Sequence, residues 1–122
     1  MQFQHLFTPI QIGPVLVKNR IVSLPHFTRF QFNRNNDPPD QYLEYQRSRA
    51  KGGSGLIILQ PLRVHKATPG SGTSGPQSLE ILKTKLTRMA QALHEHGAKV
   101  VTQLRHMGGE GDSAENAVVQ AL

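Results

Sequence analysis

The order of apolar and polar segments predicts an α/β fold with parallel strands. Three short runs rich in apolar residues alternate with two segments of helical character along the 122 residues. Each run is apolar almost throughout, which is typical of strands that are covered on both faces. Because a strand, a crossover helix and a second strand normally form a right-handed parallel unit, this order indicates a sheet with helices packed against it.

The first elements are expected to be a β-hairpin and a short strand. Residues 9–17 read PIQIGPVLV, with a Gly-Pro turn signal between two apolar pieces. Residues 19–24 read NRIVSL and precede a proline, which predicts a buried strand. The polar, turn-rich segment 26–39 is long for a simple connection, so we expect a functional or poorly ordered loop there.

The first helix and the second core strand follow. The helix is expected to begin at residues 38–40, because two prolines and an aspartate suit a first turn. Gly52 and Gly53 are expected to end it. Residues 55–59 read GLIIL, which predicts a second buried strand.

A second polar connection, residues 64–77, leads to the clearest helix in the sequence. Ser78 is its expected N-cap and Gly97 its stop signal. Apolar residues at spacings of three and four give this helix one continuous apolar face: Leu79, Leu82, Leu86, Met89 and Leu93. Residues 98–104 predict the third strand, and residues 106–112 a glycine-rich loop.

The composition argues against several classes of site. There is no cysteine, so no disulfide, zinc–thiolate site or iron–sulfur cluster can form within these residues. The net charge is +6, but Lys and Arg are scattered, so no nucleic-acid partner is expected. No run approaches the roughly 18 apolar residues of a membrane span, and no export signal is recognised. We therefore expect no membrane partner and a cytoplasmic location.

Candidate site residues follow the three predicted strands. Ligands of parallel α/β sheets bind at the carboxyl ends of the strands. These ends carry Pro25, His26 and Thr28, then Gln60, then Gln103. The Gln103 amide could pair with the edge of a heterocycle, or it could satisfy neighbouring backbone groups. His26 could be an acid, a donor or an anion contact, or it could make only local hydrogen bonds.

Several blocks of the sequence resemble the old yellow enzyme family, which includes NADH:flavin oxidoreductases and 2,4-dienoyl-CoA reductase-like enzymes. They occur in the family's order and span almost the whole chain: LFTP at residues 6–9 with Ile12-Gly13, KNRIV at 18–22 with Pro25, Tyr45 with RAKGGSGLII at 49–58, and residues 94–99 with Gln103-Leu104 and His106-Met107-Gly108.

This resemblance implies the N-terminal portion of a (β/α)8 TIM barrel with an opening β-hairpin. Residues 1–122 would form an incomplete FMN-binding domain, with about three strands and two helices, because a complete barrel takes about 250 residues. The cofactor would be FMN, with NAD(P)H as electron donor and an activated alkene or an amine as substrate.

Carried over residue by residue, the resemblance places Pro25, His26 and Thr28 beside the flavin, Gln60 near it, and Gln103 on its pyrimidine edge. The catalytic residues would lie beyond Leu122. Two positions depart from the family pattern. Phe27 stands where a Cys or Thr often tunes the flavin, and Gly109 stands where an arginine is usual.

A rival hypothesis is a non-catalytic half-barrel or an oligomeric interaction module. Three apolar strands make a poor free-standing sheet, so the chain is expected to need either self-association or the remaining part of the barrel. A flavodoxin-like domain is a further alternative, against which the opening hairpin and the glutamine of the third strand count.

Overall fold

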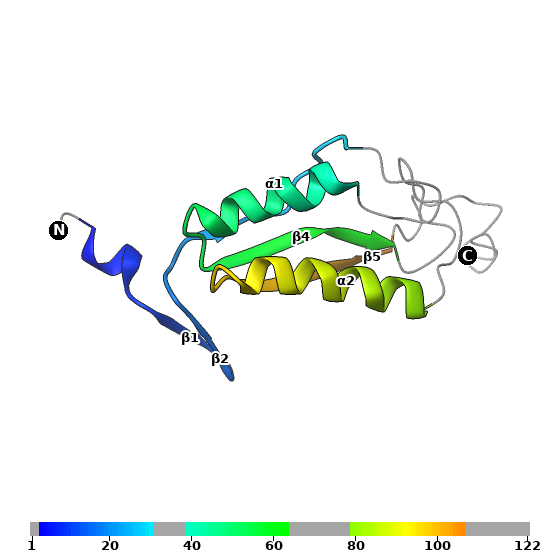
Figure 1. The fold of residues 1–122 in the computed structure, drawn as a ribbon. Coiled ribbons are helices and arrows are strands. Elements are labelled where there is room, and N and C mark those ends of the chain that lie inside the picture. Colours follow the sequence, from blue (N-terminus) through cyan, green and yellow to red (C-terminus); the bar gives the residue numbers. More distant parts are fainter. Residues whose placement is uncertain (1–2, 31–38, 64–78, 107–122) are drawn as a thin grey trace, which may run out of the picture.

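The computed structural model describes residues 3–30, 39–63 and 79–106 (Figure 1). A short 3-10 helix, which the sequence analysis did not predict, occupies Gln4–Phe7. The other elements, in chain order, are β1 Ile10–Ile12, β2 Val15–Val17, β3 Val22–Ser23, α1 Asp40–Lys51, β4 Leu56–Arg63, α2 Leu79–His94 and β5 Lys99–Arg105.

The strands form two separate sheets. β1 and β2 pair antiparallel, and Gly13 between them has a φ of 55°, a value that glycine adopts easily in a tight hairpin turn. β3, β4 and β5 are parallel in that spatial order. The predicted hairpin and the predicted α/β class with parallel strands are both confirmed.

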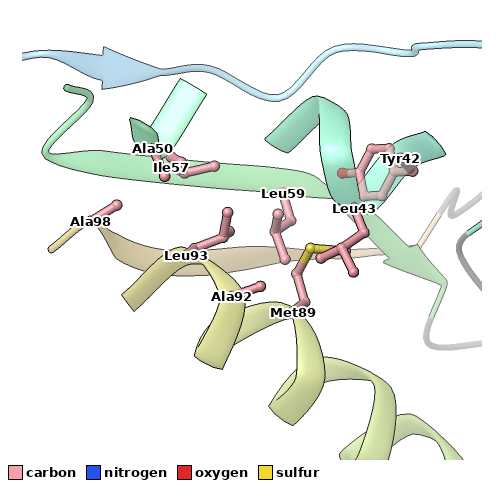
Figure 2. Close-up of a cluster of buried hydrophobic side chains, with 9 residues drawn as sticks. All are labelled: Tyr42, Leu43, Ala50, Ile57, Leu59, Met89, Ala92, Leu93 and Ala98. Atoms are coloured by element: carbon pink, nitrogen blue, oxygen red, sulfur yellow. The ribbon is translucent and has the colours of Figure 1, made fainter. Parts of the chain in front are cut away.

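Both helices pack on the same face of the parallel sheet. Ile57 and Leu59 of β4 share one core with side chains of α1 and α2 (Figure 2). The complete cluster is Tyr42, Leu43, Ala50, Ile57, Leu59, Met89, Ala92, Leu93 and Ala98. Burial of a large aliphatic side chain stabilises a fold by about 1.5–3 kcal/mol, so this cluster is the main source of cohesion in the described part of the chain.

The other face of the parallel sheet carries exposed apolar side chains. Val22 and Leu24 at β3 and Val101 of β5 expose 42%, 68% and 47% of their surface. The described residues thus cover one face only, and the other is the face for which the sequence analysis expects cover from self-association or from the remaining part of the barrel. Alternation along the strands explains the pattern, because successive side chains point to opposite faces and only one face meets the helices.

Two strands differ in length from their predicted ranges. β3 comprises only Val22–Ser23 instead of residues 19–24. The side chain of Asn19, at the start of the predicted range, makes two hydrogen bonds to backbone groups. Its Nδ2 donates to the carbonyl of Gly53 at 2.8 Å, and its Oδ1 accepts from the Ile21 amide at 3.1 Å. Asn19 thus joins the segment before β3 to the turn before β4.

β4 extends to Arg63, four residues beyond its predicted end, and contains Pro61. A proline lacks the N–H that a regular ladder needs. The register with β5 shifts between Leu59 and Leu62, so the strand passes the proline through a bulge. The strand was predicted too short because the prediction followed the apolar run at residues 55–59, which ends before Gln60.

The helix ends agree with the sequence signals where they can be compared. α1 begins at Asp40 and ends just before Gly52-Gly53, as predicted. α2 ends at His94 and is followed by a turn in which Gly97 has a φ of 70°. β5 starts and ends one residue later than predicted. The proposed N-cap Ser78, residues 31–38 of the first long loop, residues 64–77 and the glycine-rich loop after His106 lie outside the described residues.

Candidate functional site

The carboxyl ends of the three parallel strands meet at one edge of the sheet. Ile58 of β4 is paired with Val101 of β5, so Gln60 and Gln103, each two residues further on, are neighbours on adjacent strands. Both glutamines belong by alternation to the face opposite the helices. Gln60 is half-buried and Gln103 is exposed. The structure thus brings together two of the predicted site residues.

The Gln103 side chain makes no hydrogen bond to another residue in the described ranges. Among the described residues, the Gln103 amide therefore does not bond neighbouring backbone groups, which was the alternative interpretation of this side chain. A primary amide offers two donor hydrogens and one acceptor oxygen. Gln103 presents this combination, exposed, at the edge where ligands of parallel sheets bind.

Gln60 is held by its backbone rather than by its side chain. Its amide donates to the Tyr42 hydroxyl at 3.2 Å, and its carbonyl accepts from the Thr102 hydroxyl at 3.4 Å. Tyr42 lies on α1 and is buried, with 2% of its surface exposed. Burial raises the pKa of the Tyr42 phenol above its ordinary value of 10.0, although hydrogen bonds to Gln60 and Gln46 oppose that effect.

His26 lies three residues after β3 and is engaged by α1. Its Nε2 is hydrogen-bonded to the Tyr45 hydroxyl, and its Nδ1 lies 3.4 Å from the Leu24 carbonyl. The His26 and Tyr45 rings also form an edge contact, with centroids 5.2 Å apart. The imidazole therefore has partners at both nitrogens, as the local alternative expects, while its surface remains exposed.

Tyr45 contacts several residues around His26, and the sequence analysis did not include it in the site. Its ring contacts Phe30 edge to face at 5.8 Å, and the Arg49 guanidinium lies 3.2 Å from the ring centroid. Such cation–π contacts contribute about 0.5–1 kcal/mol at exposed sites. The one available signal was the four-residue spacing of Tyr45 and Arg49, which places them on the same side of a helix.

Pro25 and Thr28 continue the same segment. Pro25 is half-buried, and the Thr28 hydroxyl accepts a local hydrogen bond from the Phe30 amide at 3.4 Å. Between them and Phe30, Arg29 adopts a φ of 58°, which few residues other than glycine adopt. This turn brings Phe30 back against Tyr45, so the segment after β3 is folded onto α1.

The described residues contain no group of three or more His, Cys, Asp or Glu side chains that could hold a metal ion. Within the same ranges, no helix has the length and apolar character needed to cross a membrane.

The described fold is a parallel sheet with its helices on one face, and its strand ends meet at the edge where ligands of parallel α/β sheets bind. Residues 5–121 match the NADH:flavin oxidoreductase / NADH oxidase family, and the chain belongs to that family. The chain is 32% identical over 112 residues to the N,N-dimethylglycine/sarcosine dehydrogenase of Chromohalobacter salexigens. That match covers 88% of this chain and 16% of the relative.

Two solved structures extend the comparison. A complex of 2-naphthoyl-CoA reductase with 2-naphthoyl-CoA matches with a TM-score of 0.78 and 32% identity, over 93% of this chain and 17% of that protein. The old yellow enzyme homologue from Zymomonas mobilis matches with a TM-score of 0.67 and 30% identity, over 84% and 28%. The resemblance to old yellow enzymes is confirmed, and the chain spans less than a third of each of these three proteins.

Proposed function

We propose that this chain forms one wall of the FMN site of an oxidoreductase. The complete site would transfer hydride from NAD(P)H through FMN to an activated alkene, or would oxidise an amine. The observation that carries the proposal is the pair of adjacent glutamines at the carboxyl edge of the sheet, of which Gln103 presents a side-chain amide that no other described residue hydrogen-bonds. Membership of the NADH:flavin oxidoreductase family supplies the cofactor class.

The donor set at this edge fits a flavin. The pyrimidine end of the isoalloxazine ring presents N–H and C=O groups side by side, which the donor and acceptor of the Gln103 amide can match. Gln60 would line the floor next to it. Pro25, His26 and Thr28 would line the adjoining side, with His26 oriented by Tyr45. When bound, FMN supplies the hydride chemistry, and these residues supply position and hydrogen bonds.

We further propose that β3, β4 and β5 are the first three strands of a (β/α)8 barrel, so that residues 1–122 form part of an FMN-binding domain. The exposed apolar side chains Val22, Leu24 and Val101 support this arrangement, because in a barrel that face lines the filled interior. Active sites of such barrels combine residues from several strand ends. The proton-transfer groups would then come from beyond Leu122. A cytoplasmic location is part of the same proposal.

A second candidate function is a non-catalytic interaction module. The specific observation in its favour is that apolar side chains are exposed on the 3-10 helix and the hairpin as well as on the open face of the sheet: Phe7, Ile12, Val15 and Leu16 in addition to Val22, Leu24 and Val101. Such a surface is expected to be covered by a partner, by a second copy or by further chain.

Titration of FMN against the full chain, followed by quenching of flavin fluorescence, tests the proposal. We expect saturable binding that Gln103→Ala weakens about tenfold, since the loss of two hydrogen bonds costs about 1–2 kcal/mol. Gln91→Ala is the matched control. It makes the same truncation at an exposed position of α2, away from the strand ends, and should leave the affinity unchanged.

Two results would contradict the flavin proposal. One is equal affinity of the Gln103→Ala variant and the parent chain. The other is no FMN binding in a chain whose sedimentation shows self-association, which would favour the interaction module.

A further inference from the structure

A buried phenol lies directly behind the strand end that carries Gln60. Tyr42 comes from the first turn of α1, and Figure 2 shows it beside the part of β4 that approaches the arrowhead. Its ring belongs to the apolar core, but its hydroxyl accepts the backbone N–H of Gln60 at 3.2 Å. This is a contact between the helix layer and the backbone of a strand, which a purely apolar core residue would not make.

The Gln60 backbone needs such a partner because the ladder is irregular at this point. The register between β4 and β5 shifts between Leu59 and Leu62, so Gln60 and Pro61 together oppose one residue of β5. An extra residue in a strand leaves backbone groups without their ladder partners. A fully buried amide without a partner costs about 1–3 kcal/mol, so at the half-buried Gln60 the Tyr42 hydroxyl offsets part of such a penalty.

The carbonyl of Gln60 is hydrogen-bonded to the neighbouring strand β5. The Thr102 hydroxyl of β5 donates to it at 3.4 Å. The Tyr42 phenol is itself hydrogen-bonded to Gln46, a buried polar residue one turn further along α1. Gln46, Tyr42, Gln60 and Thr102 thus form a chain of hydrogen bonds that runs from α1 through the bulge to β5.

The phenol at the centre of this network is buried. The pKa of Tyr42 is raised by desolvation, so the hydroxyl is neutral throughout the physiological range. The phenol oxygen accepts the N–H of Gln60, and the hydrogen bond with Gln46 lowers the Tyr42 pKa as the bond with Gln60 does.

We infer that Tyr42 is a positioning residue for the cofactor site. Its hydroxyl holds the bulged end of β4 so that Gln60 stands beside Gln103 at the carboxyl edge of the sheet. This inference rests on the proposed function for its consequence in flavin binding, but the anchoring of Gln60 is a property of the chain itself. Tyr42→Phe is the sharpest variant, because it removes only the hydroxyl and keeps the ring in the core.

The first measurement is amide hydrogen exchange of Gln60, followed by NMR on the full chain without FMN. We expect Tyr42→Phe to accelerate exchange at Gln60 by roughly tenfold or more, and to leave Ile57 of the same strand unchanged. Tyr45→Phe is the matched control. It removes the other of the chain's two tyrosine hydroxyls, which contacts His26 and not β4, and should leave Gln60 exchange unchanged. Unchanged exchange at Gln60 in Tyr42→Phe would overturn the inference.

The second measurement is a double-mutant cycle on FMN affinity. Tyr42→Phe should weaken FMN binding about threefold to tenfold and shift the visible band of the bound flavin. In a Gln60→Ala background, the same change should have no further effect, because Tyr42 acts through Gln60. An equal loss in both backgrounds would assign Tyr42 a general structural role and overturn the inference. If the parent chain binds no FMN, the proposed function fails together with this consequence, and the exchange result alone decides whether Tyr42 anchors β4.

Discussion

The two faces of the parallel sheet are built from similar residues but have opposite surroundings. On the closed face, Ile57 and Leu59 of β4 meet α1 and α2, and Ile57 has no exposed surface (Figure 2). On the open face, Val101 of β5 exposes 47% of its surface. Aliphatic side chains on the closed face therefore stabilise the described part of the chain. Those on the open face are free of the helices and can pack against further chain or a partner.

The largest effect is expected on the closed face. Ile57→Ala removes a fully buried side chain and leaves a cavity between two helices and a strand, so it should lower the free energy of unfolding by about 2–5 kcal/mol. Val101→Ala is the matched change on the open face and should cost less than about 1 kcal/mol. Urea denaturation of the full chain and both variants measures the two costs.

Equal costs at the two positions would show that the open face is also covered in solution. If the cost of Val101→Ala rises with protein concentration, the cover is a second copy of the chain. If it does not, the cover belongs to the chain itself.

The same contrast shows how much of the fold could be predicted from the sequence. The order of elements follows from apolar periodicity, which is a local property, and so do the ends of α1 at Asp40 and Gly52. The full length of β4 could not be predicted, because Pro61 normally interrupts a strand and only pairing with β5 shows that a bulge accommodates it. That an apolar face remains to be covered follows from runs that are apolar almost throughout, but which face meets the helices could not be predicted from such runs.

For the candidate site, the sequence predicted positions but not contacts. The neighbourhood of Gln60 and Gln103 follows from parallel strands of matched length, and the structure shows it. The contacts of Tyr42 with Gln60 and of Tyr45 with His26 connect residues 18 and 19 positions apart. They depend on how α1 crosses the sheet, which no local pattern encodes.

An intermediate effect is expected where the hairpin segment joins the closed side of the sheet. Asn19 is buried and holds both the Gly53 carbonyl and the Ile21 amide. Asn19→Ala should lower the free energy of unfolding by about 1–3 kcal/mol, because both backbone groups lose their side-chain partner. Urea denaturation measures the loss. Asn19→Asp keeps the acceptor for Ile21 but sets a carboxylate oxygen against the Gly53 carbonyl, so it should lose at least as much stability as Asn19→Ala. Stability equal to the parent in Asn19→Asp would contradict this assignment.

The tight packing behind Asn19 gives a related prediction. A Cβ added at Gly55 would lie 2.8 Å from the Asn19 carbonyl oxygen and 2.9 Å from Cγ1 of Val17. Gly55→Ala should therefore cost about 1–3 kcal/mol through overpacking, in contrast to the usual small gain from replacing glycine. Thermal unfolding of the variant checks the sign, and an increase in melting temperature would contradict the close approach.

The buried phenol predicts a pH dependence on the closed face. The pKa of Tyr42 in the folded chain lies above its ordinary value of 10.0 because of burial. Because the pKa of the phenol is higher in the folded than in the unfolded chain, its contribution to the free energy of unfolding is fully present below about pH 10. That contribution is lost as the pH rises through the pKa of the folded state. The free energy of unfolding of the parent should fall more steeply above pH 10 than that of Tyr42→Phe. Parallel pH profiles in the two proteins would show that Tyr42 is not buried in solution.

The smallest effect is expected at the outer surface of the closed face. Arg88 of α2 and Asp40 of α1 form an ion pair at 2.8 Å, but their side chains expose 65% and 80% of their surface. Exposed pairs contribute about 0–1 kcal/mol and are screened by salt. Arg88→Gln should therefore lower the free energy of unfolding by less than about 1 kcal/mol, and the difference from the parent should vanish in high salt. A larger, salt-independent loss would show that charge pairing between the helices, and not burial of Ile57 and its neighbours, holds α1 and α2 together on this face.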